Sequence, residues 1–500
     1  MKSLAKGLYK LLTLTCISFF ISHCLTFDFQ FNIPIAPLGD KNHWVLISIP
    51  LSKWEDFQIR TNKKYSKPYI QNGNVFIPLS KSEWESINET FDYIKINISN
   101  VGFKFFDGSH PEQLSNLNFD LTNLKSGYKD NLLNTKYLNQ IVASFPMLAS
   151  LEEIGKTKNK HPILALKITK KNFNENQKVS ILFSCAMHAN EVISTDHCYD
   201  IIHTLLENQK YTERYLNKLN IWIIPIVNPE GSDAFWNQSH LLGRKNDSTL
   251  PNLGVDLNRN FPIHWGKSGS EYSSDKKDSP YFRGLHEGSE LETQALIHLF
   301  ERENFVASIS FHAFANSLLY PYSIEGFQNP EPDLAKEFGR KLTRFIRSTN
   351  SNKPFKFRKN IYPVDGVDQD FYYFKYGTLA YIFETSHFNP EYKHVGKIIE
   401  NYRIVWLRLL DEISFGKKLL YRILDEEGNP IKANVQLENH KFFQGETRQN
   451  HPTTGIYYSY YTSEMLGNIT FSSDGYLPMQ QKTKATSSFE PLEIRLKKLP

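Results

Sequence analysis

Two residue types that bind zinc follow an apolar run near the middle of the chain. The run covers residues 179–187, and His188 and Glu191 come directly after it. An apolar segment of this length is typical of a buried strand in a parallel sheet. Ligands of α/β proteins bind at the carboxyl ends of such strands, and a histidine with a carboxylate supplies two of the three protein ligands of a catalytic zinc. The pair alone is a weak signal, because most polar residues at this spacing serve the surface or internal hydrogen bonds.

A second histidine and a further carboxylate follow two other strand-like runs. His312 comes directly after residues 305–311, and at the same sheet edge it supplies the missing third ligand, although a lone histidine there would more often be a hydrogen-bonded core residue. Glu384 follows the run 378–383, where a carboxylate is costly to bury unless something uses or pairs it. Hydrolysis of an amide at a zinc site needs such a base, which takes a proton from the attacking water and returns one to the leaving amine. The alternative is a glutamate that caps a helix or forms a salt bridge.

Two arginines lie between these segments. Arg244 stands in Gly243-Arg-Lys-Asn246, and Arg259 follows Asn258 in a loop flanked by glycine and proline. An arginine beside an open zinc can bind a carboxylate through two parallel hydrogen bonds, or stabilise the oxyanion that forms as water adds. Without a metal site nearby, both would be interpreted as surface arginines.

The elements that must position these residues alternate in type. Apolar runs predict strands at residues 163–168, 179–187, 221–227, 305–311 and 378–383. Helical spacing of apolar residues appears around 138–148, 193–205, 290–301 and 333–347. This alternation predicts an α/β fold, a mixed and mostly parallel sheet with helices on both faces.

The regions on either side of this domain have a β-rich pattern. Short aromatic-rich runs such as residues 44–50 and 93–98 indicate a small N-terminal domain, in which no chemistry is evident. Beyond a boundary near 414–418, short alternating runs predict a β-sandwich. We therefore expect a signal peptide at 1–24, a β-rich domain of open role at 25–125, a central domain at 130–413 and a β-sandwich at 418–500.

The amino terminus is typical of an exported protein. Lys2, Lys6 and Lys10 precede the apolar residues 11–21, which form a signal-peptide core too short to span a bilayer. Cleavage near residues 22–24 predicts a secreted, periplasmic or cell-envelope protein. The segment before Cys24 also resembles a bacterial lipoprotein cleavage site, so a lipid anchor at Cys24 is the alternative, although His23 is larger than that pattern prefers. No later run is long enough to span a membrane.

Composition limits the partners and the cysteine chemistry. The net charge of +5 is spread along 500 residues without a basic block interleaved with aromatics, which argues against nucleic-acid binding. If the leader is removed, only Cys185 and Cys198 are certain to remain, and we expect separate buried thiols rather than a disulfide. A monomer is expected.

Together, these residues resemble the zinc metallocarboxypeptidase family. The resemblance rests on His188 with Glu191, the loop with Asn258-Arg259, His312 in Ser-Phe-His-Ala-Phe-Ala-Asn-Ser-Leu-Leu-Tyr-Pro-Tyr, and Tyr362 ahead of Glu384. It covers about residues 130–413 and also includes 282–284 and 289–293. A transthyretin-like module after the catalytic domain, as at 418–500, is a feature of the regulatory, carboxypeptidase N/E-like branch.

The resemblance implies an enzyme that hydrolyses the C-terminal peptide bond of peptides or proteins with one Zn²⁺ per chain. It implies zinc ligands at His188, Glu191 and His312. Glu384 would then be the catalytic base, and Arg244 would polarise the scissile carbonyl. The residues implied to bind the free carboxylate of the substrate are Asn258, Arg259 and Tyr362.

Departures from the family pattern bear on specificity. The digestive branch has an arginine at the position of Asn190. In this respect the chain agrees with the regulatory branch. Ser323, however, occupies the position of that branch's acidic determinant for Lys or Arg ends, and Gln369, which agrees with the branch, carries no charge. These two substrate-binding candidates favour a neutral or apolar C-terminal residue, with Asp365 or Asp368 as alternative acidic groups in the pocket.

Two other functions fit part of this pattern. A related zinc amidohydrolase, acting on N-acyl amino acids or on peptidoglycan peptides, would share the zinc ligands, but a deacylase need not keep Asn258 and Arg259 with Tyr362. An inactive homologue that serves as a binding module would have lost a ligand or the base, and neither is lost here.

Overall fold

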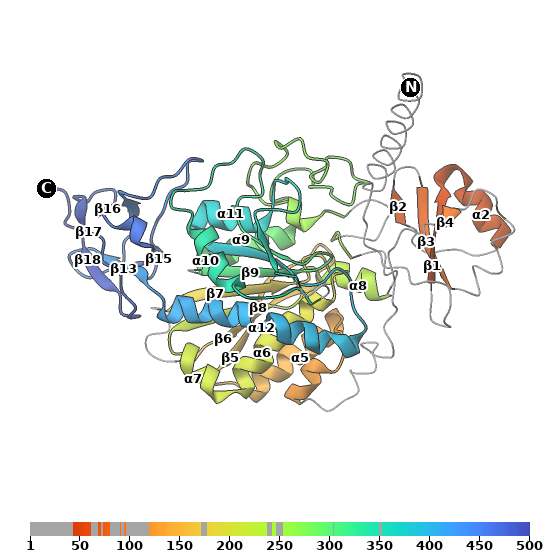
Figure 1. Cartoon of the computed structure of the whole chain (residues 1–500), viewed down its shortest axis with the longest axis horizontal. Helices are drawn as coiled ribbons and strands as arrows, with labels where there is room; N and C mark the ends of the chain where they lie inside the picture. The colour runs from red at the N-terminus through yellow and green to blue at the C-terminus, as the bar shows by residue number, and fades with distance from the viewer. Residues whose placement is uncertain are drawn as a thin grey trace, which may run out of the picture.

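The computed structural model describes residues 44–61, 69–71, 74–80, 91, 95–96, 120–171, 178–237, 243–246, 254–303, 305–349 and 353–500. A central α/β domain lies between a small N-terminal sheet and a pair of C-terminal sheets (Figure 1). The predicted leader at 1–24 lies outside the described residues. None of the helices in the described ranges is long and apolar enough to cross a membrane.

The N-terminal sheet has four strands in the order β2-β3-β1-β4. Its central strands, β1 (Trp44–Pro50) and β3 (Asn74–Ser80), pair antiparallel along their whole length. The outer strands are β2 (Tyr69–Gln71) and β4 (Lys95–Ile96). After η1 (Leu51–Lys53), helix α2 (Trp54–Thr61) buries Phe57 together with Ile47, Ile49 and Val75. The predicted β-rich region, including the strand at 44–50, is confirmed in these described segments.

The central sheet has eight strands in the order β11-β10-β12-β9-β7-β8-β6-β5. Its middle strands, β12, β9, β7 and β8, run parallel to one another, and β10, β6 and β5 add antiparallel pairs. Every residue of β7, β8 and β9 is buried, which explains why these strands were visible as continuous apolar runs. The strands are β5 (Ala149–Lys156), β6 (Pro162–Ile168), β7 (Val179–Cys185), β8 (Leu219–Ile224), β9 (Phe305–His312), β10 (Ser317–Leu319), β11 (Lys356–Arg358) and β12 (Leu379–Glu384).

Helices cover both faces of this sheet, as predicted. One face packs Phe183 and Phe311 against Trp406 and the helices α5, α6, α10 and α12. The other packs Leu182 and Trp222 against Leu296 and the helices α9 and α11. The bounds are η2 (Leu121–Lys125), α5 (Asn131–Ser144), α6 (Ile193–Glu207), α7 (Gln209–Tyr215), α8 (Pro229–Asn237), η4 (Leu257–Arg259), α9 (Leu291–Arg302), α10 (Leu334–Thr343), α11 (Asp368–Tyr376) and α12 (Tyr392–Phe415).

The C-terminal region has two three-stranded sheets, ordered β15-β13-β18 and β14-β16-β17. Tyr421 of one sheet meets Phe471 of the other with ring centroids 5.1 Å apart, so the sheets face each other across an apolar core. This agrees with the predicted β-sandwich; its likeness to transthyretin stays a prediction. The elements are β13 (Lys418–Leu424), β14 (Asn434–Leu437), β15 (Ile456–Tyr460), η5 (Ser463–Met465), β16 (Asn468–Ser472), β17 (Met479–Lys482) and β18 (Leu492–Arg495).

Some predicted bounds were displaced. Helix α5 spans 131–144 rather than the apolar pattern at 138–148, because the carboxylate of Asp130 accepts a hydrogen bond of 2.8 Å from the Leu133 amide and starts the helix earlier. Strand β8 covers 219–224 rather than 221–227, since the chain turns toward α8 after Ile224. The short strands β10 and β11, three residues each at one end of the sheet, carry too few residues for a periodic signal.

Candidate functional site

Three neighbouring parallel strands bring the candidate residues to one edge of the sheet. Strand β9 lies between β7 and β12, and in the register of β9 with β12 the Cα partner of His312 is Glu384. On the other side, Cys185 at the end of β7 pairs with Phe311. His188 and Glu191 lie in the turn that follows β7. The predicted meeting of these strand ends is therefore confirmed.

A buried group of two histidines and one glutamate forms the centre of the site. Ligand atoms of His188, Glu191 and His312 all lie within 4.8 Å of one another. The Glu191 carboxylate contacts both rings, at 2.8 Å from His188 Nδ1 and 2.9 Å from His312 Nδ1. Burial opposes ionisation of Glu191, but the charges of the two histidines hold the pKa of Glu191 well below its ordinary value. This donor set matches the two histidines and one carboxylate of catalytic zinc sites.

The remaining ring nitrogen of each histidine also has a partner. His188 Nε2 lies 2.9 Å from Asp256 Oδ1, and His312 Nε2 lies 3.1 Å from Ser310 Oγ. Such contacts fix the orientation of a metal-binding imidazole. Sequence reasoning missed both partners. Asp256 does begin the segment that carries Asn258 and Arg259. Its place beside these two candidate residues was the signal that could have identified it as part of the site.

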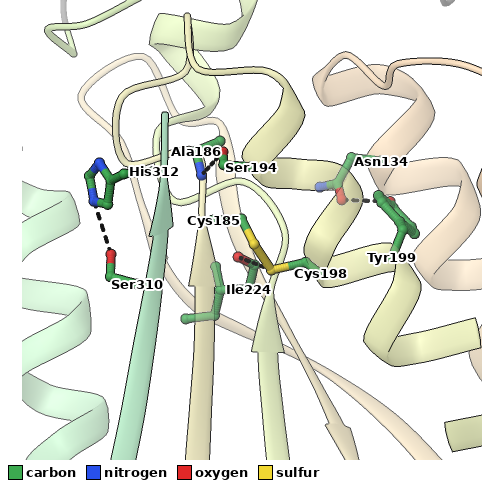
Figure 2. The surroundings of a disulfide bond; sticks show 9 residues. All are labelled: Asn134, Cys185, Ala186, Ser194, Cys198, Tyr199, Ile224, Ser310 and His312. Atoms are coloured by element: carbon green, nitrogen blue, oxygen red, sulfur yellow. Dashed lines mark hydrogen bonds between the residues drawn. A yellow bond between two sulfur atoms is a disulfide. The ribbon is translucent and has the colours of Figure 1, made fainter. Parts of the chain in front are cut away.

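A disulfide closes the chain around the turn that carries His188 and Glu191. Cys185 at the end of β7 is bonded to Cys198 on α6, with their Cα atoms 6.4 Å apart (Figure 2). The expectation of separate thiols was wrong. It treated the two residues as independent of each other, but α6 returns along β7 and brings its second turn against the strand end. Ser194 Oγ, in the first turn of α6, accepts a hydrogen bond of 3.0 Å from the Ala186 amide.

Glu384 presents a carboxylate oxygen with no partner. Its Oε2 atom is buried and has no hydrogen bond within the described part of the chain. Burial raises the pKa of Glu384 well above its ordinary value; the charge of Glu191 adds to the rise, and those of His188 and Arg244 oppose it. A carboxylate held in this way, beside the His–Glu–His group, is suited to accept and return a proton.

Arg244 lies directly against the histidine cluster. Its Nη2 atom donates to Asp256 Oδ2 at 2.6 Å, and its Nη1 atom lies 3.4 Å from His188 Nδ1 and 3.9 Å from Glu191 Oε1. Burial opposes the charge, but Asp256 raises the pKa of Arg244 above its ordinary value. Asp256, fully buried, therefore holds both His188 and a permanently charged guanidinium.

The structure also brings Asn258, Arg259 and Tyr362 together. Arg259 donates through Nη2 to Tyr362 Oη at 3.2 Å and through Nη1 to the Asn258 carbonyl at 2.5 Å. Tyr362 stacks on Tyr272, with ring centroids 3.9 Å apart. These three predicted residues form a cationic group next to the two histidines and Glu191, with Asn258 and Arg259 buried and Tyr362 half-buried. We call this group the carboxylate clamp.

Tyr281 joins the clamp to Arg244 and was not predicted. Its ring centroid lies 5.1 Å from Arg244 Cζ and 5.7 Å from Arg259 Cζ. Burial raises the pKa of Tyr281 to about 12, so the ring stays neutral between two cations. A lone tyrosine in an irregular segment offers no periodic or spacing signal, which is why sequence reasoning missed it.

The two candidate specificity residues lie together and satisfy each other. Gln369 Nε2 donates to Ser323 Oγ at 2.7 Å, and both side chains are buried. The amide of Ser323 donates to Asp370 Oδ2 at 2.8 Å. Gln369 Oε1 accepts from the Ile382 amide, two residues before Glu384.

The alternative acidic groups serve other contacts. Asp365 is fully buried and accepts hydrogen bonds from the amides of Lys267 and Ser268 and from Ser273 Oγ. Its carboxylate is thus engaged in holding the loop at 267–273. Asp368 accepts from the Gln369 amide at 2.7 Å, and Ser310 is a further hydrogen-bond partner.

Comparisons with known proteins agree with this geometry. The model of the zinc carboxypeptidase family, Peptidase_M14, matches residues 134–404. Mast cell carboxypeptidase A of Rattus norvegicus is 29% identical over 206 residues, 39% of this chain and 48% of the relative. Metallocarboxypeptidase A of Trichophyton rubrum is 27% identical over 330 residues, 62% of this chain and 75% of the relative. The chain spans about half the length of the first curated relatives that it matches.

Two crystal structures share the fold. That of thrombin activatable fibrinolysis inhibitor has a TM-score of 0.54 at 19% identity, over 74% of this chain and 98% of the solved one. Carboxypeptidase A from Helicoverpa armigera has a TM-score of 0.51 at 17% identity, over 73% of this chain and 95% of the solved one.

Proposed function

Because the chain belongs to the zinc carboxypeptidase family, whose model matches more than half of its length, we propose that it hydrolyses the C-terminal peptide bond of peptides or proteins. The observation that carries the proposal is the position of the carboxylate clamp. Arg259 and Tyr362, 3.2 Å apart, adjoin the group His188, Glu191 and His312 through Tyr281 and Arg244.

The residues of the central group fit a zinc ion. Two imidazoles and one carboxylate, all buried and within 4.8 Å of one another, are the donor set that catalytic zinc prefers. His188, Glu191 and His312 would hold the ion, one per chain. When bound, zinc supplies a Lewis acid that polarises a carbonyl and lowers the pKa of water.

Glu384 and Arg244 perform the chemistry beside that group. Glu384 takes a proton from the attacking water and returns it to the leaving amine, a role that suits its buried Oε2 atom, which has no hydrogen-bond partner among the described residues. Arg244, 3.9 Å from Glu191, donates hydrogen bonds to the carbonyl oxygen of the scissile peptide as negative charge develops there.

The carboxylate clamp explains why only the last bond would be cleaved. The guanidinium of Arg259 can bind a free carboxylate through two parallel hydrogen bonds. Asn258 contributes its side chain, and the Tyr362 hydroxyl adds a further donor. A peptide continuing past this point would leave the cation unpaired, which is a strong penalty in a buried site.

The C-terminal residue that the enzyme removes is proposed to have a neutral side chain. Ser323 and Gln369 are uncharged and occupy each other's hydrogen-bonding groups. Of the acidic alternatives, Asp365 already has three donors. Asp368 accepts from the Gln369 amide and from Ser310. A substrate ending in Lys or Arg would therefore have to compete with these contacts for a carboxylate partner.

Export and the outer domains complete the proposal. The leader at 1–24 and the disulfide between Cys185 and Cys198 both favour an oxidising compartment outside the cytosol. A lipid anchor at Cys24 is the alternative to simple cleavage of the leader. We also propose a monomer with domains at 25–125, 130–413 and 418–500, the last transthyretin-like.

One experiment tests the function directly. The purified protein is incubated with peptides that differ only in their C-terminal residue, each with a free or an amidated C-terminus, with and without a zinc chelator. Release of single C-terminal amino acids from the free forms alone, lost on chelation, is expected. Hydrolysis of N-acyl amino acids without peptide cleavage would instead favour the deacylase, and binding without turnover the inactive homologue.

A further inference from the structure

A buried hydrogen bond joins the C-terminal sandwich to the central domain. Tyr322, which precedes Ser323, donates through its hydroxyl to Glu446 Oε1 at 2.7 Å. Tyr322 has no exposed surface and Glu446 is 6% exposed. The other oxygen of Glu446 accepts from the Gln444 amide at 2.8 Å. Both carboxylate oxygens are thus engaged, one within the sandwich and one across the domain boundary.

Ser323, the next residue, connects the Tyr322–Glu446 contact to two elements of the active site. Its amide and hydroxyl bond Asp370 and Gln369 at the start of α11. Its carbonyl accepts hydrogen bonds from Asn360 Nδ2 at 3.0 Å and from the Val364 amide at 3.2 Å. These last two residues flank Tyr362, so one peptide unit holds both sides of the segment that carries the clamp tyrosine.

Other contacts of the sandwich fall on the same elements. Arg448 donates to the Phe374 carbonyl at 3.3 Å and lies 5.6 Å from the ring centroid of Tyr373, both on α11. The backbones of Glu331 and Lys441 exchange two hydrogen bonds, of 3.0 and 2.8 Å. The sandwich therefore supports the loop that follows Tyr322 and the helix that carries Gln369.

We propose that Glu446 is a positioning residue of the substrate site. From the C-terminal sandwich it fixes Tyr322 and Ser323, and through them the loop that holds Tyr362 against Arg259. The inference rests on the proposed carboxypeptidase function and adds a role for residues 418–500 in it. A hydrogen bond from a buried hydroxyl to a carboxylate is worth about tenfold or more in an equilibrium constant, enough to change how often the clamp is assembled.

The test uses the full-length protein and the variants Tyr322→Phe, Glu446→Ala and Glu446→Gln. Tyr322→Phe removes only the hydroxyl, and it keeps the inference testable if Glu446→Ala does not fold. For a peptide with a free C-terminus we expect KM to rise by about tenfold in Tyr322→Phe and Glu446→Ala, with kcat changed much less. Glu446→Gln keeps an oxygen acceptor for Tyr322 but gives up the one for the Gln444 amide, so it should restore part of the loss. Zinc retention against a chelator should match the parent in all three.

Hydrogen exchange provides a readout that needs no turnover. Amides at 358–366 should exchange faster in Tyr322→Phe and Glu446→Ala than in the parent, while those of β7 and β9 do not change. Glu493→Ala is the matched control, since Glu493 lies in the same sandwich with a side chain 49% exposed; its kinetics and exchange should equal the parent's.

The outcomes separate this inference from the proposed function. An inactive parent rejects the function, and exchange at 358–366 still decides whether Glu446 positions the loop. An active parent whose KM and exchange are the same in Tyr322→Phe rejects the inference. A loss of zinc or of kcat in place of a KM effect would also reject it, because the contact would then support the fold in general rather than the clamp.

Discussion

Glu384 and His312 are Cα partners at the ends of two adjacent parallel strands, β12 and β9. The proposed base and one proposed ligand therefore keep a fixed separation set by the sheet rather than by a loop. Groups placed on regular elements are held more tightly than groups on loops. This placement makes the chemistry of Glu384 separable from metal binding.

Glu384→Gln should retain zinc and lose about 10³-fold or more of kcat, because the amide keeps the shape but cannot accept the proton. Metal content by absorption spectroscopy and steady-state kinetics measure the two effects. Glu400→Gln, an exposed change on α12, serves as the control. Comparable rates in Glu384→Gln and the parent would refute the assignment of the base.

Arg259→Lys should weaken the clamp, because lysine cannot form two parallel hydrogen bonds to a carboxylate. We expect kcat/KM on a peptide with a free C-terminus to fall by about tenfold or more, and the small residual rate on its C-terminal amide to stay the same. The exposed Arg302→Lys provides the control. An equal loss on both substrates would mean that Arg259 does not bind the carboxylate.

Asp256→Asn should loosen the metal site, because the partner of His188 Nε2 loses its charge. Loss of such a partner costs about 10- to 100-fold in metal affinity. Competition with a zinc chelator measures the change in the free protein. Ser310→Ala, on the other histidine, should have a smaller effect, since it removes a neutral partner. Unchanged zinc affinity in both variants would argue against a role for these contacts.

The double variant Cys185→Ala/Cys198→Ala should lower the free energy of unfolding by about 3 kcal/mol, the magnitude for a closed loop of this length. Denaturant titration of the zinc-free protein measures this stability without a contribution from the metal. Chelator resistance should fall as well, because the loop contains both His188 and Glu191. If Cys185 and Cys198 of the folded parent reacted with a thiol reagent, the disulfide would not be formed.

Glu292 should make stability depend on pH. Burial raises its pKa from 4.5 to about 7, so the folded state holds a proton that the unfolded state releases above about 4.5. Its contribution is present below that pH and is lost as pH rises to about 7, by at most about 3 kcal/mol. Urea titrations at pH 5 and pH 8 should show this loss in the parent, and Glu292→Gln should reduce the difference. If the free energy of unfolding fell by the same amount between pH 5 and pH 8 in both proteins, the raised pKa of Glu292 would be contradicted.

The parts of the site that sequence could predict are those fixed by strand ends. His188, His312 and Glu384 each follow an apolar run, and a parallel sheet brings such positions together whatever the loops do. The same reasoning predicted the α/β fold, because β7, β8 and β9 are buried along their whole length.

The contacts that could not be predicted from the sequence depend on the paths of irregular segments and on how the helices pack. Tyr281 and Asp256 reach the site through loops whose paths carry no periodic signal. The pairing of Cys185 with Cys198 depends on the angle at which α6 leaves β7. Ser323 and Gln369 were identified as candidates, but their mutual hydrogen bond depends on the packing of α11 against β12.

Asp256 has a consequence for how this protein tolerates change. One oxygen holds His188 and the other holds Arg244, so substitutions at these two positions act on a shared partner and their effects should not add. Such epistasis would constrain evolution, because a change at Arg244 removes the partner of a buried carboxylate that also orients His188.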